Sequence, residues 1–210
     1  MNKKSVKIYR VEEAICSPIG STDSEIAIIR ANSSNDSQLR KMCNIAKSLE
    51  KGNVFSIAII VADNSTWELN KELTPSYGTW TVADSSLNAD KVENDICRII
   101  ETNGLIDLDV NDFISLLKGE RFYYASADGD KFEDVMGTIE TEAKKQGKNI
   151  FDSKKILMSI CIKDDVTIEE MNRINDFLEG FHDNFECKWG LIELPVSSSS
   201  SVRVVVLAIL

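Results

Sequence analysis

The sequence predicts an α/β protein that consists of a parallel-sheet half, a connecting helix and a second half of the α+β type. Between Glu25 and Val82 the pattern is strand, helix, strand. Two apolar strands around one helix are typical of parallel pairing through a right-handed crossover. From Phe122 to the end of the chain, strand and helix patterns continue. With 210 residues, 43% of them hydrophobic, the chain can bury one substantial core or two small ones.

The elements of the first half follow from hydrophobic periodicity. Ile26–Ile29 is a short apolar strand, residues 54–61 form a strand of the buried type, and Gly52 ends the helix between them. That helix is marked by apolar residues at helical spacing: Leu39, Met42, Cys43, Ala46 and Leu49. After a turn-rich stretch at 74–78, a helix of about five turns is indicated by the repeat of Ala89, Val92, Ile96, Ile99 and Ile100. An additional strand near the start, with Val6 and Ile8 on one face, is left open.

The second half contains its own strands and helices. Strands are predicted at 122–127, 156–162, 185–191 and 202–209. One helix begins at Phe132 and is closed by Lys144, Lys145 and Gly147. The residues Thr167–Glu170 form a capping box that opens a second helix.

Composition excludes several classes of function. A net charge of −10 repels phosphodiester backbones and anionic lipid surfaces. The five cysteines lack the pair spacing of a metal site, and their odd number in a chain without a secretory segment favours reduced thiols. No window has the length needed to span a bilayer. We therefore expect a cytoplasmic protein with no metal, no nucleic-acid partner and no direct membrane contact.

The most informative segment is residues 103–117, NGLIDLDVNDFISLL, which places three carboxylates in a turn between two apolar helical patterns. It resembles the loop that FtsZ and its tubulin relatives insert into the nucleotide site of the neighbouring subunit, which in FtsZ reads roughly GLINLDFADV. Asp109 and Asp112 match that motif, and Asp107 replaces its Asn.

The resemblance continues to the C-terminus. Residues 155–163 (KILMSICIK) are similar to the FtsZ strand GVLVNITGG, residues 166–178 to the helix after it, and residues 202–209 (VRVVVLAI) to VRVTVIAT. Residues 25–62 resemble the strand, helix and strand that lead to the FtsZ central helix. The resemblance implies a truncated FtsZ/tubulin-like parallel-sheet half (1–82), a central helix (83–102) and a C-terminal α+β domain of mixed sheet plus helices (103–210).

The nucleotide site that FtsZ carries is poorly matched. FtsZ wraps the phosphates with a segment that resembles GGGTGTG, because only glycine lets backbone N–H groups approach an anion so closely. Here none of the ten glycines lies within three positions of another, and Ser21 and Thr22 are a poor substitute. P-loop and dinucleotide fingerprints are absent for the same reason. We expect no cofactor to be bound by the chain alone.

The resemblance also locates the base and ribose contacts. Ser86 matches the Phe that stacks on guanine, and Asp90 matches the acid that reads it. Of the ribose contacts, an acid is matched by Ser37 and an Arg by Lys41. Asp90 and Lys41 are therefore interpreted as a weak remnant of a guanine nucleotide site.

Each of these residues also has a structural interpretation. Asp90 fits an exposed first-turn acid that the helix dipole favours, and Asp109 fits an N-cap supported by Asp112. A cap and a catalytic role are compatible, since a capped loop is rigid. Asp107 adds a charge that repels a triphosphate by roughly 4 kcal/mol at about 4 Å and an effective dielectric of about 20.

The remaining chemistry-bearing residues have ordinary interpretations. The single histidine, His182, fits a helix end or surface position, and Trp67, Trp80 and Trp189 fit core or interdomain space.

Three functions remain open. In the first, an FtsZ-like protein without GTPase activity of its own presents Asp109 and Asp112 in trans to an FtsZ-like subunit, or to itself, in a head-to-tail contact, and so caps or modulates filaments. In the second, a reduced self-assembling GTPase binds GTP through residues 1–24. In the third, a homo-oligomeric module binds an unrelated ligand. Because FtsZ continues beyond the position of Leu210 into a peptide that recruits membrane adaptors, tethering by that route is not expected.

Overall fold

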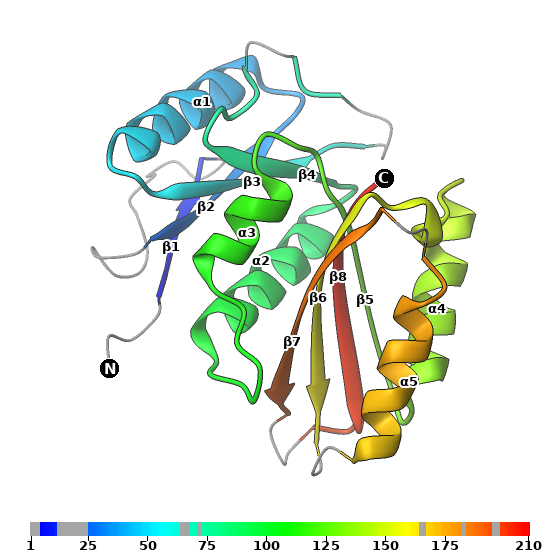
Figure 1. The fold of residues 1–210 in the computed structure, drawn as a ribbon. Helices are drawn as coiled ribbons and strands as arrows, with labels where there is room; N and C mark the ends of the chain where they lie inside the picture. Colours follow the sequence, from blue (N-terminus) through cyan, green and yellow to red (C-terminus); the bar gives the residue numbers. More distant parts are fainter. Residues whose placement is uncertain are drawn as a thin grey trace. The chain divides into compact units, whose positions relative to one another are not determined.

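The structure, a computed structural model, describes residues 5–11, 25–63, 68–70, 73–163, 167–181, 184–194 and 198–210. The chain divides into two compact units (Figure 1). Unit 1 comprises Met1–Thr102 and Asp109–Phe122, and unit 2 comprises Asn103–Leu108 and Tyr123–Leu210. Ser21, Thr22, Trp67 and His182 lie outside the described residues.

Unit 1 contains a parallel sheet of four strands in the order β1-β2-β3-β4. The strands are β1 (Val6–Arg10), β2 (Ile26–Asn32), β3 (Phe55–Val61) and β4 (Gly78–Ala83). The residues near the start of the chain do form an additional strand of this sheet, because β1 pairs with β2 and Val6 lies opposite Ile26. Strand β4 was not predicted, since its start overlaps the turn-rich stretch at 74–78.

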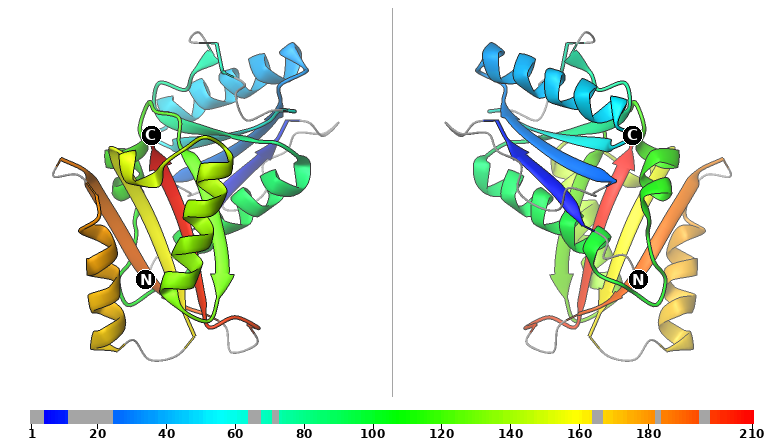
Figure 2. Two further views of the ribbon diagram at one scale, coloured as in Figure 1. Left: turned by 90° about the vertical axis from the view of Figure 1, so that its right-hand side faces the viewer. Right: turned by 90° about the vertical axis from the view of Figure 1, so that its left-hand side faces the viewer.

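Two helices cover the two faces of this sheet (Figure 2). Helix α1 (Asp36–Lys51) packs against alternate residues of β2 and β3, among them Ile29 and Ile60. Helix α2 (Ser86–Glu101) lies on the other face, where it meets Arg30 near the end of β2 and Val6 at the start of β1. These contacts show that α2 runs antiparallel to the strands. Its 16 residues make about four and a half turns.

The edge of β4 is covered by the segment that follows helix α3 (Val110–Leu117). The N–H of Gly119 donates to the Gly78 carbonyl at 2.6 Å, and the N–H of Phe122 donates to the Trp80 carbonyl at 2.9 Å. On this strand Trp80 is buried in the core beneath α1. Pairing with residues 119–122 therefore gives β4 a second neighbour.

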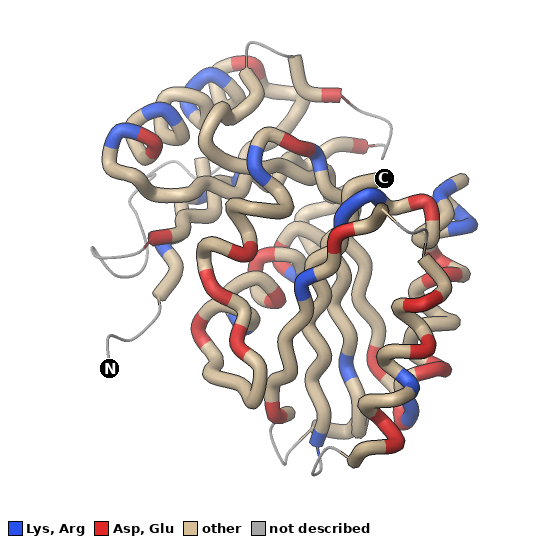
Figure 3. Tube along the Cα trace, in the orientation of Figure 1, with Lys and Arg blue, Asp and Glu red and all other residues tan. Residues whose placement is uncertain are grey.

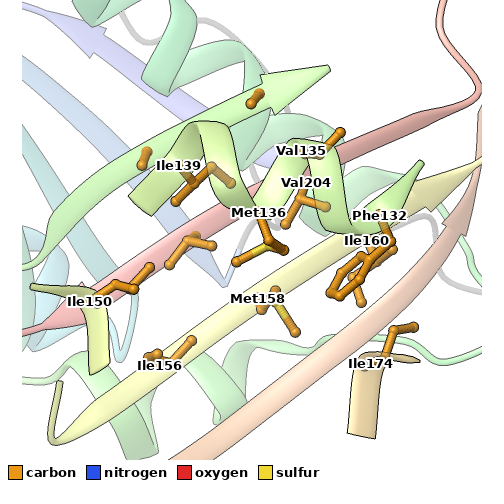
Figure 4. Close-up of a cluster of buried hydrophobic side chains, with 14 of the residues drawn as sticks. Phe132, Val135, Met136, Ile139, Ile150, Ile156, Met158, Ile160, Ile174 and Val204 are labelled. Atoms are coloured by element: carbon orange, nitrogen blue, oxygen red, sulfur yellow. The ribbon is translucent and has the colours of Figure 1, made fainter. Parts of the chain in front are cut away.

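Unit 2 is built on a mixed sheet in the order β5-β8-β6-β7, in which only the β6–β7 pair is parallel. Helices α4 and α5 pack on one face, over a core to which Met136, Met158 and Val204 contribute (Figure 4). The predicted capping box is confirmed, because the N–H of Thr167 donates to the Glu170 carboxylate at 2.8 Å. The elements are β5 (Tyr123–Gly129), α4 (Phe132–Lys145), the short 3₁₀ helix η2 (Ile150–Asp152), β6 (Lys155–Ile162), α5 (Ile168–Leu178), β7 (Glu186–Glu193) and β8 (Val202–Ile209).

The two sheets confirm the predicted α/β class, with a parallel half followed by a mixed α+β half. Within the described ranges, no helix combines the length and the apolar character needed to cross a bilayer. The four described cysteines, Cys43, Cys97, Cys161 and Cys187, are free thiols.

Candidate functional site

The first part of the predicted loop, Asn103–Leu108, belongs to unit 2 and is fixed to the edge strand β7. The N–H of Leu105 donates to the Leu191 carbonyl at 2.8 Å, and the N–H of Leu191 donates to the Ile106 carbonyl at 2.9 Å. A Cβ at Gly104 would lie 2.1 Å from the Leu191 oxygen, so only glycine permits this approach. The result is a turn held by backbone contacts, with the side chain of Leu105 79% exposed.

Asp107 closes this turn. Its Oδ1 accepts a hydrogen bond from the N–H of Gly104 at 2.8 Å, and the residue is exposed. The carboxylate that replaces the Asn of the FtsZ motif therefore has a local structural partner in unit 2.

The second part of the loop opens helix α3 in unit 1. Oδ1 of Asp109 accepts hydrogen bonds from the N–H groups of Asn111 at 2.8 Å and Asp112 at 3.1 Å. In return, Oδ2 of Asp112 accepts from the N–H of Asp109 at 2.9 Å. The two residues form a reciprocal capping box, which confirms the predicted N-cap.

The cap leaves the carboxylates accessible while it fixes their positions. Asp109 is exposed and Asp112 is partly exposed, whereas Phe113, Leu116 and Leu117 anchor the helix in the core. Figure 3 shows acidic residues along the segment between α2 and α3. Fixed, solvent-facing carboxylates of this kind can orient a water molecule or accept donors from a partner surface.

Asp90 has a different environment from the one its sequence position suggested. It is the fifth residue of α2, not a first-turn acid, and it forms an ion pair with Nη1 of Arg30 in β2. Arg30 is 4% exposed, and its Nη2 also donates to the Ser86 carbonyl at 3.2 Å. The predicted first-turn position of Asp90 is therefore wrong, whereas its side chain is 48% exposed, and its carboxylate neutralises the buried cation of Arg30.

Lys41 lies on the exposed surface of α1. Since α1 and α2 cover opposite faces of the sheet, the structure does not place Lys41 and Asp90 on one face (Figure 2). Both helices do begin at the carboxyl edge of the parallel strands, which is where ligands bind in open α/β sheets. The assignment of these two residues to a nucleotide site stays a prediction.

Arg30 is the site residue that the sequence analysis missed. It is the only charged residue in a strand of otherwise apolar or neutral side chains, Ile26–Asn32. A buried guanidinium requires an acidic partner. An arginine inside a strand of the buried type was the signal that pointed to an acid on the covering helix.

A small cavity in unit 1 lies between α1 and the segment before β4. It is lined by residues that include Cys43, Glu50, Ser56 and Tyr77, and its volume is about 10 Å³. That volume holds about one water molecule. It does not accommodate a nucleotide.

The thiols of Cys97 and Cys187 are not activated nucleophiles. Burial, together with the carboxylates of Glu101 and Glu93, raises the pKa of Cys97 to about 12. Burial raises the pKa of Cys187 to about 11. Both groups are protonated at neutral pH, so neither supplies a thiolate. In the part of the chain that the structure describes, no group of three His, Cys, Asp or Glu side chains can hold a metal ion.

Comparison with known proteins identifies the fold. No family model and no curated protein sequence matches the chain. Among solved structures, the chain is similar to an empty FtsZ dimer from M. jannaschii, with 13% identity and a TM-score of 0.63 over 89% of this chain and 63% of that one. It is also similar to CetZ from Methanosaeta thermophila, with 12% identity and a TM-score of 0.58 over 90% of this chain and 62% of that one.

A third match is TubZ from Bacillus thuringiensis serovar israelensis in GDP-form protofilaments, with 10% identity and a TM-score of 0.57 over 87% of this chain and 60% of that one. The chain thus spans less than two thirds of the length of each of these proteins. At such low identity the likeness establishes the architecture. The chain has the FtsZ/tubulin-like fold.

Proposed function

We propose that this chain is a filament-modulating protein of the FtsZ/tubulin type, which binds no GTP alone and docks onto an FtsZ-like subunit through residues 103–117. The observation that carries the proposal is the capping box of Asp109 and Asp112, which holds two solvent-accessible carboxylates in fixed positions. A preorganised loop loses little conformational entropy on docking, and this favours binding.

The proposal that GTP is not bound alone is supported by the carboxyl edge of the unit 1 sheet. Asp90 forms an ion pair with buried Arg30. The 210 residues contain no closely spaced glycines to wrap phosphates. A nucleotide at the start of α2 would have to displace the Arg30–Asp90 ion pair. The chain lacks the glycine-rich backbone whose N–H groups would bind the phosphates and offset the free energy lost with that pair.

A subunit with a docking loop and no nucleotide site joins a filament at one end only. Head-to-tail contacts are heterologous, so a subunit that offers one of the two surfaces terminates growth or alters turnover at that end. The similar structures include a dimer and protofilaments, in which copies of this fold associate. We propose the same kind of association for this chain, with an FtsZ-like partner.

The test is to add the chain to polymerising FtsZ and to measure filament length and GTP turnover. We expect the wild type to change at least one of the two. The double variant Asp109→Asn/Asp112→Asn should lose the effect on turnover, because it removes both charges while asparagine still caps the helix. Asp36→Asn, which changes an exposed first-turn acid of α1, is the matched control and should behave as the wild type.

Two results would refute the proposal. One is the absence of any change in length or turnover when the wild type is added. The other is full activity of the double variant, which would show that the loop acts only as a helix cap.

A further inference from the structure

Strand β7 lies at one edge of the unit 2 sheet, and only part of its outer side is covered (Figure 1). On the inner side β7 pairs with β6. On the outer side the turn at 103–108 forms a bridge from Ile106 to Leu191. Within the described residues, no other segment pairs with this edge, so residues 185–189 are open. An open edge presents backbone N–H and C=O groups with which another strand can pair.

The direction of the backbone groups shows which residues would make such bonds. The N–H of Glu186 donates to the Lys154 carbonyl at 2.9 Å, on the inner side of β7. Both the N–H and the carbonyl of Leu191 bond to the turn, on the outer side. Because these directions alternate along a strand, Cys187 and Trp189 also direct their N–H and C=O groups outward. Cys187 is the middle residue of the open segment.

The side chains of the open segment are of two kinds. The partly buried rings of Phe185 and Trp189 pack against the core of unit 2. Glu186 and Lys188 are exposed and, by alternation, point to the opposite face. Glu186 lies 3.9 Å from Nζ of Lys155 and is 64% exposed. An ion pair so long and so exposed is weak, so the carboxylate of Glu186 remains available to a partner.

The order of these residues makes the segment complementary to itself. When two copies of β7 pair antiparallel about a two-fold axis, one residue faces its own copy. With Cys187 on the axis, Glu186 of each copy lies opposite Lys188 of the other, and Phe185 opposite Trp189. A register centred on Glu186 or Lys188 would set like charges against each other, which is destabilising. One centred on Phe185 or Trp189 sets neither charge opposite the other.

We propose that residues 185–189 form an isologous interface with a second copy of this chain, antiparallel and centred on Cys187. The four strands of each unit 2 sheet then join into one continuous sheet. Glu186 and Lys188 meet at non-hydrogen-bonded positions, where side chains on paired strands are closest. The contact uses the same surface of both copies, so it differs from the head-to-tail docking proposed above.

Reversal of the charges tests the register. Lys188→Glu and Glu186→Lys each set like charges opposite one another at both pairs of the dimer. We expect each variant, measured alone by sedimentation equilibrium, to raise the dissociation constant of the dimer at least roughly tenfold. A mixture of the two variants restores opposite charges at both pairs and should form a heterodimer about as stable as the wild-type dimer. Lys47→Glu, at an exposed position of α1, is the matched control and should leave the dissociation constant unchanged.

Hydrogen exchange of the wild type tests the same interface without any substitution, and therefore decides the question even if a variant fails to fold. The N–H groups of Cys187 and Trp189 should gain protection as the protein concentration rises through the dissociation constant. The N–H of Glu186 is bonded within the sheet and should show the same protection at all concentrations.

Four results would overturn the inference. They are a wild type that stays monomeric at millimolar concentration, charge variants that behave as Lys47→Glu does, no association when the two variants are mixed, and protection of Cys187 and Trp189 that does not depend on concentration. These experiments use the chain alone, so their outcome is independent of the proposed docking on FtsZ.

Discussion

Arg10 in β1 donates to the carboxylate of Glu93 in α2, a residue that is only 2% exposed. A second acid of the same helix, Glu101, accepts a hydrogen bond from the N–H of Val6 at 3.0 Å. Since Asp90 pairs with Arg30, three acids of α2 hold the first two strands of the sheet. Polar contacts therefore supplement the apolar packing on this face of unit 1.

Loss of the Arg10 side chain should strongly destabilise unit 1. Arg10→Ala leaves the carboxylate of Glu93 buried without its cation, and breaking such a pair costs about 3 kcal/mol. The free energy of unfolding is measured with urea. Lys7→Ala, on the same strand, is the control and should change it by less than about 0.5 kcal/mol. Equal effects of the two variants would contradict the structural role of the Arg10–Glu93 pair.

Gly104→Ala should displace the turn at 103–108 from β7. The new Cβ would lie 2.1 Å from the Leu191 oxygen, a backbone atom that cannot rotate away. We expect the amides of Leu105 and Leu191 to lose their protection against hydrogen exchange.

Gly137→Ala is the matched control for that experiment. Gly137 lies inside α4, and a Cβ there meets nothing within 4 Å. Alanine at a helix interior position should therefore raise the free energy of unfolding by up to about 1 kcal/mol. Unchanged exchange in Gly104→Ala would show that the turn does not depend on this close approach.

The capping box predicts a contrast between two changes at one position. Asp109→Ala removes the acceptor of two N–H groups and should cost about 1 kcal/mol of stability, whereas Asp109→Asn keeps a good cap and should cost much less. Chemical denaturation of both variants measures the difference. Equal losses would indicate that charge, not capping, fixes the start of α3.

Alkaline pH should destabilise the protein. The folded-state pKa of Cys97, about 12, lies above its ordinary value of 9.0, so the folded state retains a proton that the unfolded state releases. Stability is then independent of this group below pH 9 and falls as pH rises from 9 towards 12. Cys187, with a pKa of about 11, acts in the same direction.

The double variant Cys97→Ala/Cys187→Ala tests this dependence by urea unfolding at pH 9 and pH 11. We expect a smaller loss of stability over that interval than in the wild type. An unchanged loss would show that other groups, such as Tyr123, whose pKa burial also raises, are responsible.

Much of the fold follows from local patterns in the sequence. The stripe from Ala89 to Ile100 predicts α2, and the residues Thr167–Glu170 predict the start of α5, because helical periodicity and capping are properties of a few neighbouring residues. The N-cap at Asp109 is predictable for the same reason.

The missed features depend on contacts between distant residues. Strand β4 begins in a stretch rich in turn residues, and it is stabilised by β3 on one side and by residues 119–122 on the other. The Arg30–Asp90 pair joins positions 60 residues apart, and local patterns do not reveal which helix will cover which strand. The sequence therefore places Asp90 correctly in a helix but does not reveal its ion pair with Arg30.

We propose that this chain docks on an FtsZ-like filament at one end through residues 103–117. Single-filament fluorescence microscopy of labelled chain on growing FtsZ filaments tests it most directly. We expect a single label at one end of each decorated filament, and we expect this label to be lost in Asp109→Asn/Asp112→Asn. Labels distributed along the filament length, or filaments without label at saturating protein, would contradict it.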